Sequence, residues 1–339
     1  MRQVFIRAVL TLLFVLLAAQ PAFADRYDRI VRGVLPKKPL QRSKLAINAF
    51  VNDQRFGSIS SQFREVRTRL KLKKVRVLFA WNDDVQPSPN SPINFSFYDE
   101  ISRSIPRGTQ ALVILTGIPT WMRNQSNWID GNPRKTFAER WVRPVVTRYR
   151  KNSKIKAWQF WNEPNMESNQ DNVTLQMADS PGNYVELLAF SAEVSRSLTP
   201  RKKVVSAATT AINQNFPESL EYNEDLKDAG MEEIADIWAV HIYGERLETI
   251  LFPGGVGDFL NDLKKPIWIT ESGEKGVNNQ LSYAQEMWPF LFKTVPGIKR
   301  LYIYQFTEST PAESTYGLKN LTPGFYVSDL YIYLRDKLP

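Results

Sequence analysis

The chain has 339 residues, with 44 Lys and Arg against 35 Asp and Glu, and a formal net charge of +9. It contains no cysteine and one histidine, which excludes disulfide frameworks, thiolate metal sites, cysteine nucleophiles and multi-histidine metal sites. A hydrophobic fraction of 43% is typical of a globular protein and excludes a disordered chain. The chemistry that remains is that of carboxylates, hydroxyls or lysines.

The N-terminal segment predicts export. Arg2 and Arg7 accompany an apolar run over residues 9–19, and residues 22–24 read Ala-Phe-Ala, a small-x-small cleavage site. The run is shorter than the ~20 residues that span a bilayer. The pattern is therefore typical of a secretory signal peptide over residues 1–24, with an uncleaved anchor as the alternative. We expect a mature protein in the periplasm or outside the cell.

Residues 25–44 read as a basic, extended leader, and residues 45–339 as one folded domain. In this domain short apolar runs alternate with stretches of helical period. Most runs are nearly continuous, as in parallel strands that are covered on both faces. Eight strand–helix repeats in a domain of this length predict a single (β/α)₈ TIM barrel of the α/β class, typically ~250 residues. A doubly wound open sheet is the main competitor. The apolar runs span residues 45–52, 75–81, 111–117, 155–162, 204–208, 237–243, 266–270 and 301–306, and the clearest helical stretches span 59–70, 136–150, 181–198 and 280–294.

Functional side chains fall at the ends of three predicted strands. Asn162-Glu163-Pro164 ends the fourth run, the pair His241 and Tyr243 ends the sixth, and Glu271 follows the seventh. In a barrel, catalytic groups come from the C-terminal ends of several strands, so the two glutamates can face each other across the mouth. Two facing carboxylates are what cleavage of a glycosidic bond requires. Glu163 would then be protonated near neutrality while Glu271 stays ionised.

The ordered set of motifs resembles the clan A glycoside hydrolases, the retaining (β/α)₈ group that includes families 5 and 39. Arg76 in the second run is similar to the arginine that supports the nucleophile of this clan by hydrogen bonding. The segment over residues 316–326 resembles the one that follows strand eight in the family 39-like branch. The likeness covers most of residues 45–337 and is closest to family 39, with family 5 next.

The resemblance implies a role for each matching side chain. Glu271 would be the nucleophile and Glu163 the acid/base. Asn162 would hold the sugar 2-hydroxyl, and Tyr243, paired with His241 on strand six, would contact the nucleophile. It also implies that no cofactor or metal is required.

The remaining positions are less specific. Glu274, Glu245 and Glu308 also lie near strand ends and are alternative nucleophiles. His241 alone would more often be a core residue, and Arg76 could belong to a buried ion pair without a role in the mechanism. Residues 255–260 lack the third glycine of a dinucleotide-binding loop.

Three tryptophans fall at or after strand ends, where aromatic faces stack on sugar rings. Trp81, Trp121 and Trp128 are therefore predicted sugar contacts. Many relatives also place a tryptophan at the end of strand eight as a sugar platform, whereas here residues 301–306 read Leu-Tyr-Ile-Tyr-Gln-Phe. The packing tryptophans are expected to be Trp141, Trp238 and Trp288.

The expected function is an exported, monomeric, retaining β-glycosidase that acts by double displacement. Long segments over residues 82–95, 122–135 and 166–180 suggest a polysaccharide substrate, cleaved internally, such as a bacterial exopolysaccharide or biofilm glycan. The alternatives are a carbohydrate-binding pseudoenzyme and a transglycosylase on the same scaffold.

The excess of positive charge comes mainly from lysines and arginines in the segments that lead into the predicted strands. In a barrel these approaches form the face opposite the active site, where helix C-termini favour cations. We therefore expect a basic underside and no nucleic-acid partner, with docking to an anionic matrix or membrane surface as the alternative explanation. The cations are Arg42, Lys44, Lys71, Lys73, Lys74, Arg107, Lys151, Lys154, Lys156, Arg201, Lys202, Lys203, Lys264, Lys265, Lys299 and Arg300.

Overall fold

The computed structural model describes residues 35–244, 246–321, 324 and 326–338. The predicted signal peptide and the first part of the leader lie outside these residues and stay predictions. In the part of the chain that is described, no helix is long and apolar enough to cross a membrane.

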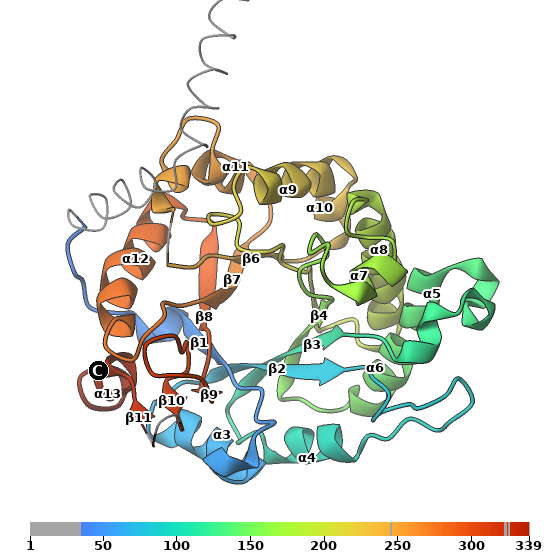
Figure 1. Cartoon of the computed structure of the whole chain (residues 1–339), viewed down its shortest axis with the longest axis horizontal. Coiled ribbons are helices and arrows are strands. Elements are labelled where there is room, and N and C mark those ends of the chain that lie inside the picture. The colour runs from blue at the N-terminus through green and yellow to red at the C-terminus, as the bar shows by residue number, and fades with distance from the viewer. Residues whose placement is uncertain (1–34, 245, 322–323, 325, 339) are drawn as a thin grey trace, which may run out of the picture.

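Eight parallel strands surround the centre of the molecule (Figure 1). Their order is β5-β4-β3-β2-β1-β8-β7-β6, and a parallel bridge between Val205 and Ile237 joins the two outer members. The predicted barrel is confirmed, and the open doubly wound sheet is excluded. The strands are β1 (Leu45–Asn48), β2 (Lys74–Ala80), β3 (Gln110–Thr116), β4 (Ile155–Phe160), β5 (Lys203–Val205), β6 (Trp238–His241), β7 (Ile267–Ser272) and β8 (Ile298–Ile303).

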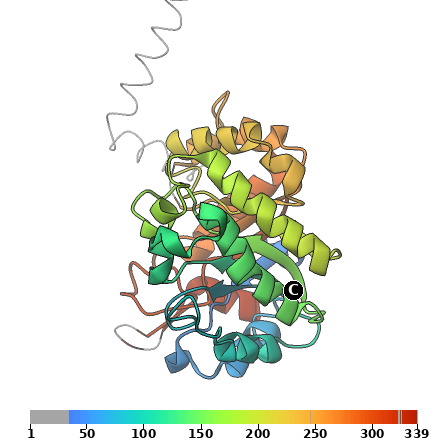
Figure 2. The ribbon, with the colours of Figure 1, turned by 90° about the vertical axis from the view of Figure 1, so that its right-hand side faces the viewer.

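Helices form the outer ring (Figure 1), and α8 runs diagonally across the side of the barrel in Figure 2. The predicted helices over residues 181–198 and 280–294 are confirmed as α8 and α12, and α8 begins with a proline, as is common at this position. The predicted helix over 136–150 is instead divided by the π-helical turn η6. The helices are α3 (Ile59–Thr68), α4 (Ser96–Ser104), α5 (Pro133–Phe137), η6 (Ala138–Val142), α6 (Arg143–Tyr149), α7 (Gln170–Thr174), α8 (Pro181–Leu198), α9 (Glu218–Asp228), α10 (Met231–Ile234), α11 (Val256–Asp262), α12 (Gln280–Thr294) and α13 (Asp329–Asp336).

Short elements complete the fold at both ends of the strands. Six short turns of helix lie in the connections of the described part of the chain, and the segment after β8 forms a small sheet that the sequence did not predict. The turns include η1 (Arg42–Lys44), η2 (Gln54–Phe56), η3 (Thr120–Arg123), η4 (Gln125–Asn127), η5 (Ile129–Gly131) and η7 (Leu247–Ile250), and the small sheet contains β9 (Thr307–Glu308), β10 (Lys319–Asn320) and β11 (Tyr326–Val327).

The inside of the barrel has an apolar layer below a polar one. Strand side chains alternate between the two faces, so residues two apart point the same way. Ala46, Ala157 and Ala239 belong to the buried apolar cluster inside the barrel. Two residues further along the same strands stand Asn48, Gln159 and His241, all buried. The apolar layer therefore closes the floor on which a polar site is built. Its other members are Leu112, Val205, Ala208, Ile237, Trp268 and Tyr302.

Strand β8 begins three residues earlier than predicted. β8 starts at Ile298, so Lys299 and Arg300 belong to the strand and not to its approach. The Arg300 guanidinium lies over the Trp268 ring, 4.0 Å from its centroid, and donates a hydrogen bond to the Tyr302 hydroxyl. These contacts stabilise a cation inside the strand.

Cations at the N-terminal ends of the strands bind the ends of helices. Arg42 donates to the carbonyl oxygens of Leu70 and Leu338. Lys154 donates to Ile105 O just beyond α4, and Lys202 to Tyr149 O at the end of α6. Carbonyls in the last turn of a helix lack intrahelical partners and carry partial negative charge. The predicted basic underside is therefore built partly by helix capping.

Two glycines in equivalent helix positions make a test of the packing. Gly182 and Gly257 are each the second residue of a helix. A Cβ at Gly257 would lie 2.1 Å from Ile250 O, whereas a Cβ at Gly182 would meet nothing within 4 Å. We expect Gly257→Ala to lower the free energy of unfolding by about 1–3 kcal/mol and Gly182→Ala to raise it by about 0.5–1 kcal/mol. Urea denaturation measures both, and equal effects of the two changes would contradict this account.

Candidate active site

Arg76 lies at the centre of the polar layer. It is the third residue of β2 and only 1% exposed. Its guanidinium donates four hydrogen bonds, all to side chains at the C-terminal ends of other strands. The acceptors are Gln159 Oε1 at 2.8 Å, Asn48 Oδ1 at 2.9 Å, Glu271 Oε1 at 2.5 Å and Asn162 Oδ1 at 2.9 Å. A planar guanidinium with donors on every side fixes the positions of all four groups.

Glu271 stands near the end of β7 and is 8% exposed. Its Oε1 accepts from Arg76, and its Oε2 accepts from the Tyr243 hydroxyl at 2.7 Å. Burial by itself raises the pKa of this carboxyl. The interactions with His241 and Arg76, together with the hydrogen bonds from Tyr243 and Arg76, outweigh burial and lower that pKa. Glu271 is thus held as a carboxylate.

Glu163 follows β4 in a strained backbone conformation, with φ of 44°. Its N–H donates to Ala208 O at 2.8 Å, and its carbonyl oxygen accepts from Asn172 Nδ2 at 2.8 Å. Asn172 is fully buried, and its side-chain oxygen accepts a hydrogen bond from the indole N–H of Trp161. The backbone of Trp161 also has a positive φ, of 77°. One amide therefore holds the backbone of the Asn-Glu-Pro turn in place.

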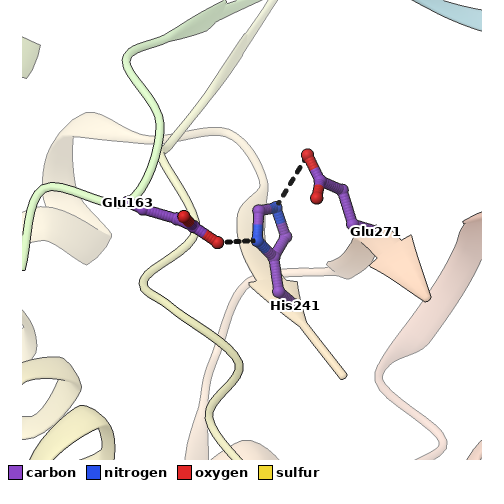
Figure 3. A group of neighbouring side chains, drawn as sticks. All are labelled: Glu163, His241 and Glu271. Atoms are coloured by element: carbon purple, nitrogen blue, oxygen red, sulfur yellow. Dashed lines mark hydrogen bonds and ion pairs between the residues drawn. The ribbon is translucent and has the colours of Figure 1, made fainter. Parts of the chain in front are cut away.

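His241 lies between the two glutamates (Figure 3). Its Nδ1 is 2.9 Å from Glu163 Oε1, and its Nε2 is 3.6 Å from Glu271 Oε1. The ring is fully buried, and Nε2 has no hydrogen-bond partner within normal length among the described residues. The histidine predicted for the site is therefore in contact with one carboxylate and close to the other.

Tyr243 is positioned through its backbone. Asn213 Nδ2 donates to Tyr243 O at 2.6 Å, and Tyr243 N donates to Asn213 Oδ1 at 3.1 Å. This pair of bonds fixes the residue whose hydroxyl reaches Glu271. Burial and the charge of Glu271 raise the pKa of the Tyr243 hydroxyl, which keeps it a donor.

The predicted sugar-contacting tryptophans have different environments. Trp81 is fully buried and packs parallel to Trp141, with ring centroids 6.1 Å apart. The prediction that Trp81 contacts a sugar is therefore wrong. Trp121 and Trp128 are half-buried in the connection after β3, and their sugar contacts stay predictions. Trp141, Trp238 and Trp288 are buried packing residues, as predicted.

Two of the alternative glutamates have structural partners. Glu308 Oε2 accepts from the Thr315 hydroxyl and from the N–H groups of Tyr316 and Gly317, so it holds the segment after β9. Glu274 accepts from Lys275 N–H and lies against Gly244. Glu245 falls outside the described residues.

Several residues of the site were not predicted from the sequence. Asn48, Gln159, Asn172 and Asn213 are buried amides that orient the charged groups. Asn48 and Gln159 are polar residues within otherwise apolar strands. This pattern is the sequence signal from which they could have been predicted. Tyr304 was noted only as a departure from tryptophan. Its ring packs against those of Tyr243, Tyr316 and Phe50 in an aromatic wall beside Glu271.

Glu163, His241 and Glu271 have ligand atoms within 4.8 Å of one another, a spacing that a metal ion could bridge. The chemistry around them does not suit one. The Arg76 guanidinium lies 2.5 Å from Glu271 and would repel a second cation there. His241 Nδ1 and Glu163 are already hydrogen bonded to each other. We therefore assign no metal to this group.

Comparison with known proteins gives the same picture. The family model of the glycosyl hydrolase catalytic core matches residues 123–305, more than half of the chain. No curated protein matches the sequence. One similar solved structure is a family 39 glycoside hydrolase from the gut symbiont Bacteroides cellulosilyticus WH2. Its TM-score is 0.61 at 16% identity, over 89% of this chain and 65% of that one.

Two other similar structures show how far the barrel is shared. A monomeric β-xylosidase from Caulobacter crescentus CB15 has a TM-score of 0.61 at 14% identity, over 89% of this chain and 69% of that one. A family 1 β-glucosidase from Thermotoga maritima has a TM-score of 0.59 at 16% identity, over 88% and 98%. The chain spans just under two thirds of the family 39 structure. The resemblance to glycoside hydrolases is confirmed: the chain belongs to the glycosyl hydrolase catalytic core family, and it shares its barrel fold with the family 39 structure and the β-xylosidase.

Proposed function

We propose that the protein is a retaining β-glycosidase that acts by double displacement, with Glu271 as nucleophile and Glu163 as acid/base. The spacing of the two glutamates carries the proposal, because carboxylate oxygens of the pair lie within 4.8 Å of each other. Retaining enzymes place their carboxyl groups ~5–5.5 Å apart, whereas inverting enzymes need ~6.5–9.5 Å to admit a water molecule. The side chain of Glu163 is also more exposed than that of Glu271, at 20% against 11%.

In the first step Glu271 attacks the anomeric carbon while Glu163 transfers its proton to the departing oxygen. In the second step Glu163 takes a proton from a water molecule, whose oxygen replaces Glu271 at the anomeric carbon. Arg76 and Tyr243 stabilise the carboxylate that attacks and later departs. Asn162 has its oxygen fixed by Arg76, which leaves the amide NH₂ to bind a sugar hydroxyl.

His241 couples the two carboxyl groups. When Glu163 is protonated, its O–H donates to Nδ1, and the ring proton then sits on Nε2, which faces the Glu271 carboxylate. This single arrangement gives a protonated acid and an ionised nucleophile at once.

The substrate we propose is a polysaccharide, cleaved internally, in an exopolysaccharide or biofilm matrix. Three long connections follow the C-terminal ends of β2, β3 and β4, on the same end of the barrel as the two glutamates. The tyrosine wall of Tyr243, Tyr304 and Tyr316 offers an aromatic surface beside Glu271. The signal peptide pattern supports export, and we propose a monomer in the periplasm or outside the cell.

Glycan digestion read by mass spectrometry tests the substrate. We expect internal cleavage of a β-linked polysaccharide, because long connections on the catalytic end suit a chain that extends past the site in both directions. Glu271→Ala protein is the control for contaminating activity. Release of single sugars alone would contradict internal cleavage, and added acceptor sugars would reveal a transglycosylase through longer products.

Substitution of the glutamates tests their roles. Glu271→Ala should lower kcat by at least about 10⁴-fold on every substrate. Glu163→Ala should lose about 10²–10⁴-fold on substrates with poor leaving groups. With aryl glycosides that need no protonation, it should retain slow turnover that azide accelerates. Glu274→Gln is the matched control and should keep near-normal activity. Normal turnover by the Glu271→Ala variant would contradict the assignment of Glu271 as the nucleophile.

Tyr243→Phe tests what holds Glu271 ionised. A hydrogen bond to a charged group is worth about 1.5–3 kcal/mol, so kcat/KM should fall about 10–100-fold. The lost donor stabilised the carboxylate, so the pKa of Glu271 should rise, and the acid limb of the pH–activity profile should move to higher pH. Tyr304→Phe should leave this limb in place because no hydrogen bond joins Tyr304 to Glu271 among the described residues. An unmoved limb in Tyr243→Phe would contradict the mechanism.

A further inference from the structure

A concave feature lies at the end of the barrel opposite Glu163 and Glu271. A cavity of about 750 Å³ opens between the end of α4, the residues that lead into β3 and those that lead into β4. Arg103, Arg107, Lys154 and Lys156 line it, and the lining contains no acidic side chain. Four cations around one concavity concentrate positive potential there. The catalytic glutamates stand at the other ends of the strands and take no part in it.

The cations of this cavity have no acidic partners among the described residues. Lys154 donates to carbonyl oxygens, including Ile105 O at 2.7 Å, and desolvation lowers its pKa. Asp99 on α4 is near enough to respond to Arg103, but its carboxylate is bound by Arg148. The positive charge of the cavity is thus left without a counterion from the protein.

Two buried side-chain donors without partners lie at or near this cavity. Thr109 belongs to its lining and is 4% exposed, yet its hydroxyl makes no hydrogen bond in the described part of the chain. Arg67 on α3 places Nη2 3.8 Å from the Cβ position of Gly108, which also lines the cavity, and its buried Nε lacks an acceptor. Buried polar atoms without partners are rare in native proteins. A ligand with acceptor oxygens in the cavity would give the hydroxyl of the lining residue Thr109 a partner.

We propose that this cavity binds a tetrahedral oxyanion, a phosphate or sulfate group, either free or as an ester on a sugar. The guanidinium groups match such a group in geometry, and the Thr109 hydroxyl supplies a further donor. A membrane surface fits less well, because the lining is concave and its apolar members are the buried Ile105 and the half-buried Pro106. The site does not depend on the glycosidase mechanism, and its occupancy is measured separately from activity.

Isothermal titration calorimetry with inorganic phosphate, at constant ionic strength, tests the site. Glucose 6-phosphate distinguishes a sugar ester from the free ion, and glucose is the neutral control. We expect both phosphates to bind and glucose not to bind. Arg103→Gln combined with Arg107→Gln should weaken binding at least about tenfold, because each lost charged donor is worth that much or more. Thr109→Val should weaken it about fivefold.

A control double variant distinguishes a specific binding site from general attraction of anions to a basic surface. Lys264→Gln with Lys265→Gln removes the same charge from the approach to β7, across the barrel from the cavity. This control should leave phosphate affinity unchanged. Thr109→Val removes a hydroxyl that has no partner, so its melting temperature without phosphate should not fall.

Three results would overturn the proposal. The first is the absence of phosphate binding to the wild-type protein. The second is an equal loss of phosphate affinity in the arginine double variant and in the Lys264/Lys265 control variant. The third is binding to vesicles of anionic lipid without binding to either phosphate, which would identify a membrane-facing surface. Glycosidase activity should be the same in all these variants, so failure of the oxyanion site and failure of the proposed activity are distinguishable.

Discussion

The contact between Arg76 and Glu271 in the centre of the barrel determines the arrangement of the site. When two charged groups are almost fully buried, the hydration energy that they lose exceeds the energy of their mutual attraction. Here the remaining donors of Arg76 are met by Asn48, Gln159 and Asn162, and the second oxygen of Glu271 is met by Tyr243. The pair therefore persists only if strands β1, β2, β4, β6 and β7 all deliver their side chains to one level. Such a pair contributes little to stability by itself, but it keeps a buried carboxylate ionised, which is the condition for a nucleophile.

The parallel barrel supplies this common level through the two-residue period of its strands. In β1, β4 and β6 an inward alanine of the apolar layer is followed two residues later by Asn48, Gln159 or His241. Small side chains below leave room for large polar ones above. The connections after the strands then add what the strands cannot reach. Glu163 stands outside β4 in a left-handed conformation that Asn172 stabilises, and it meets His241 from the side. Strands thus fix Glu271, the proposed nucleophile, while a loop places Glu163, the proposed acid/base.

The same period explains which parts of the site could be predicted from the sequence. Eight apolar runs and the polar residues at their ends were enough for the barrel and for the group of Glu163, His241, Tyr243 and Glu271, while Arg76 came from the resemblance to clan A. Trp81 was misread because its place after a strand is the same as that of a sugar-binding residue. It is five positions from Arg76, an odd number, so the two side chains point to opposite faces of the sheet, and Trp81 packs under the helices. Asn172 and Asn213 could not be predicted, since each donates to backbone oxygens whose positions depend on the folded loops.

The net charge of +9 follows from the fold more than from the substrate. When all strands run one way and the helices return, the C-terminal ends of the helices gather at one end of the barrel, and their unpaired carbonyls favour cations there. Arg42, Lys154 and Lys202 meet this demand directly. Arg103, Arg107 and Lys156 do not, because their side chains make no hydrogen bond or ion pair with the described residues. Arg103, Arg107 and Lys156 therefore carry charge that helix capping does not use, and all three line the same cavity. These three charges lie at the end of the barrel opposite Glu163 and Glu271, so they do not select the sugar that we propose binds between the two glutamates.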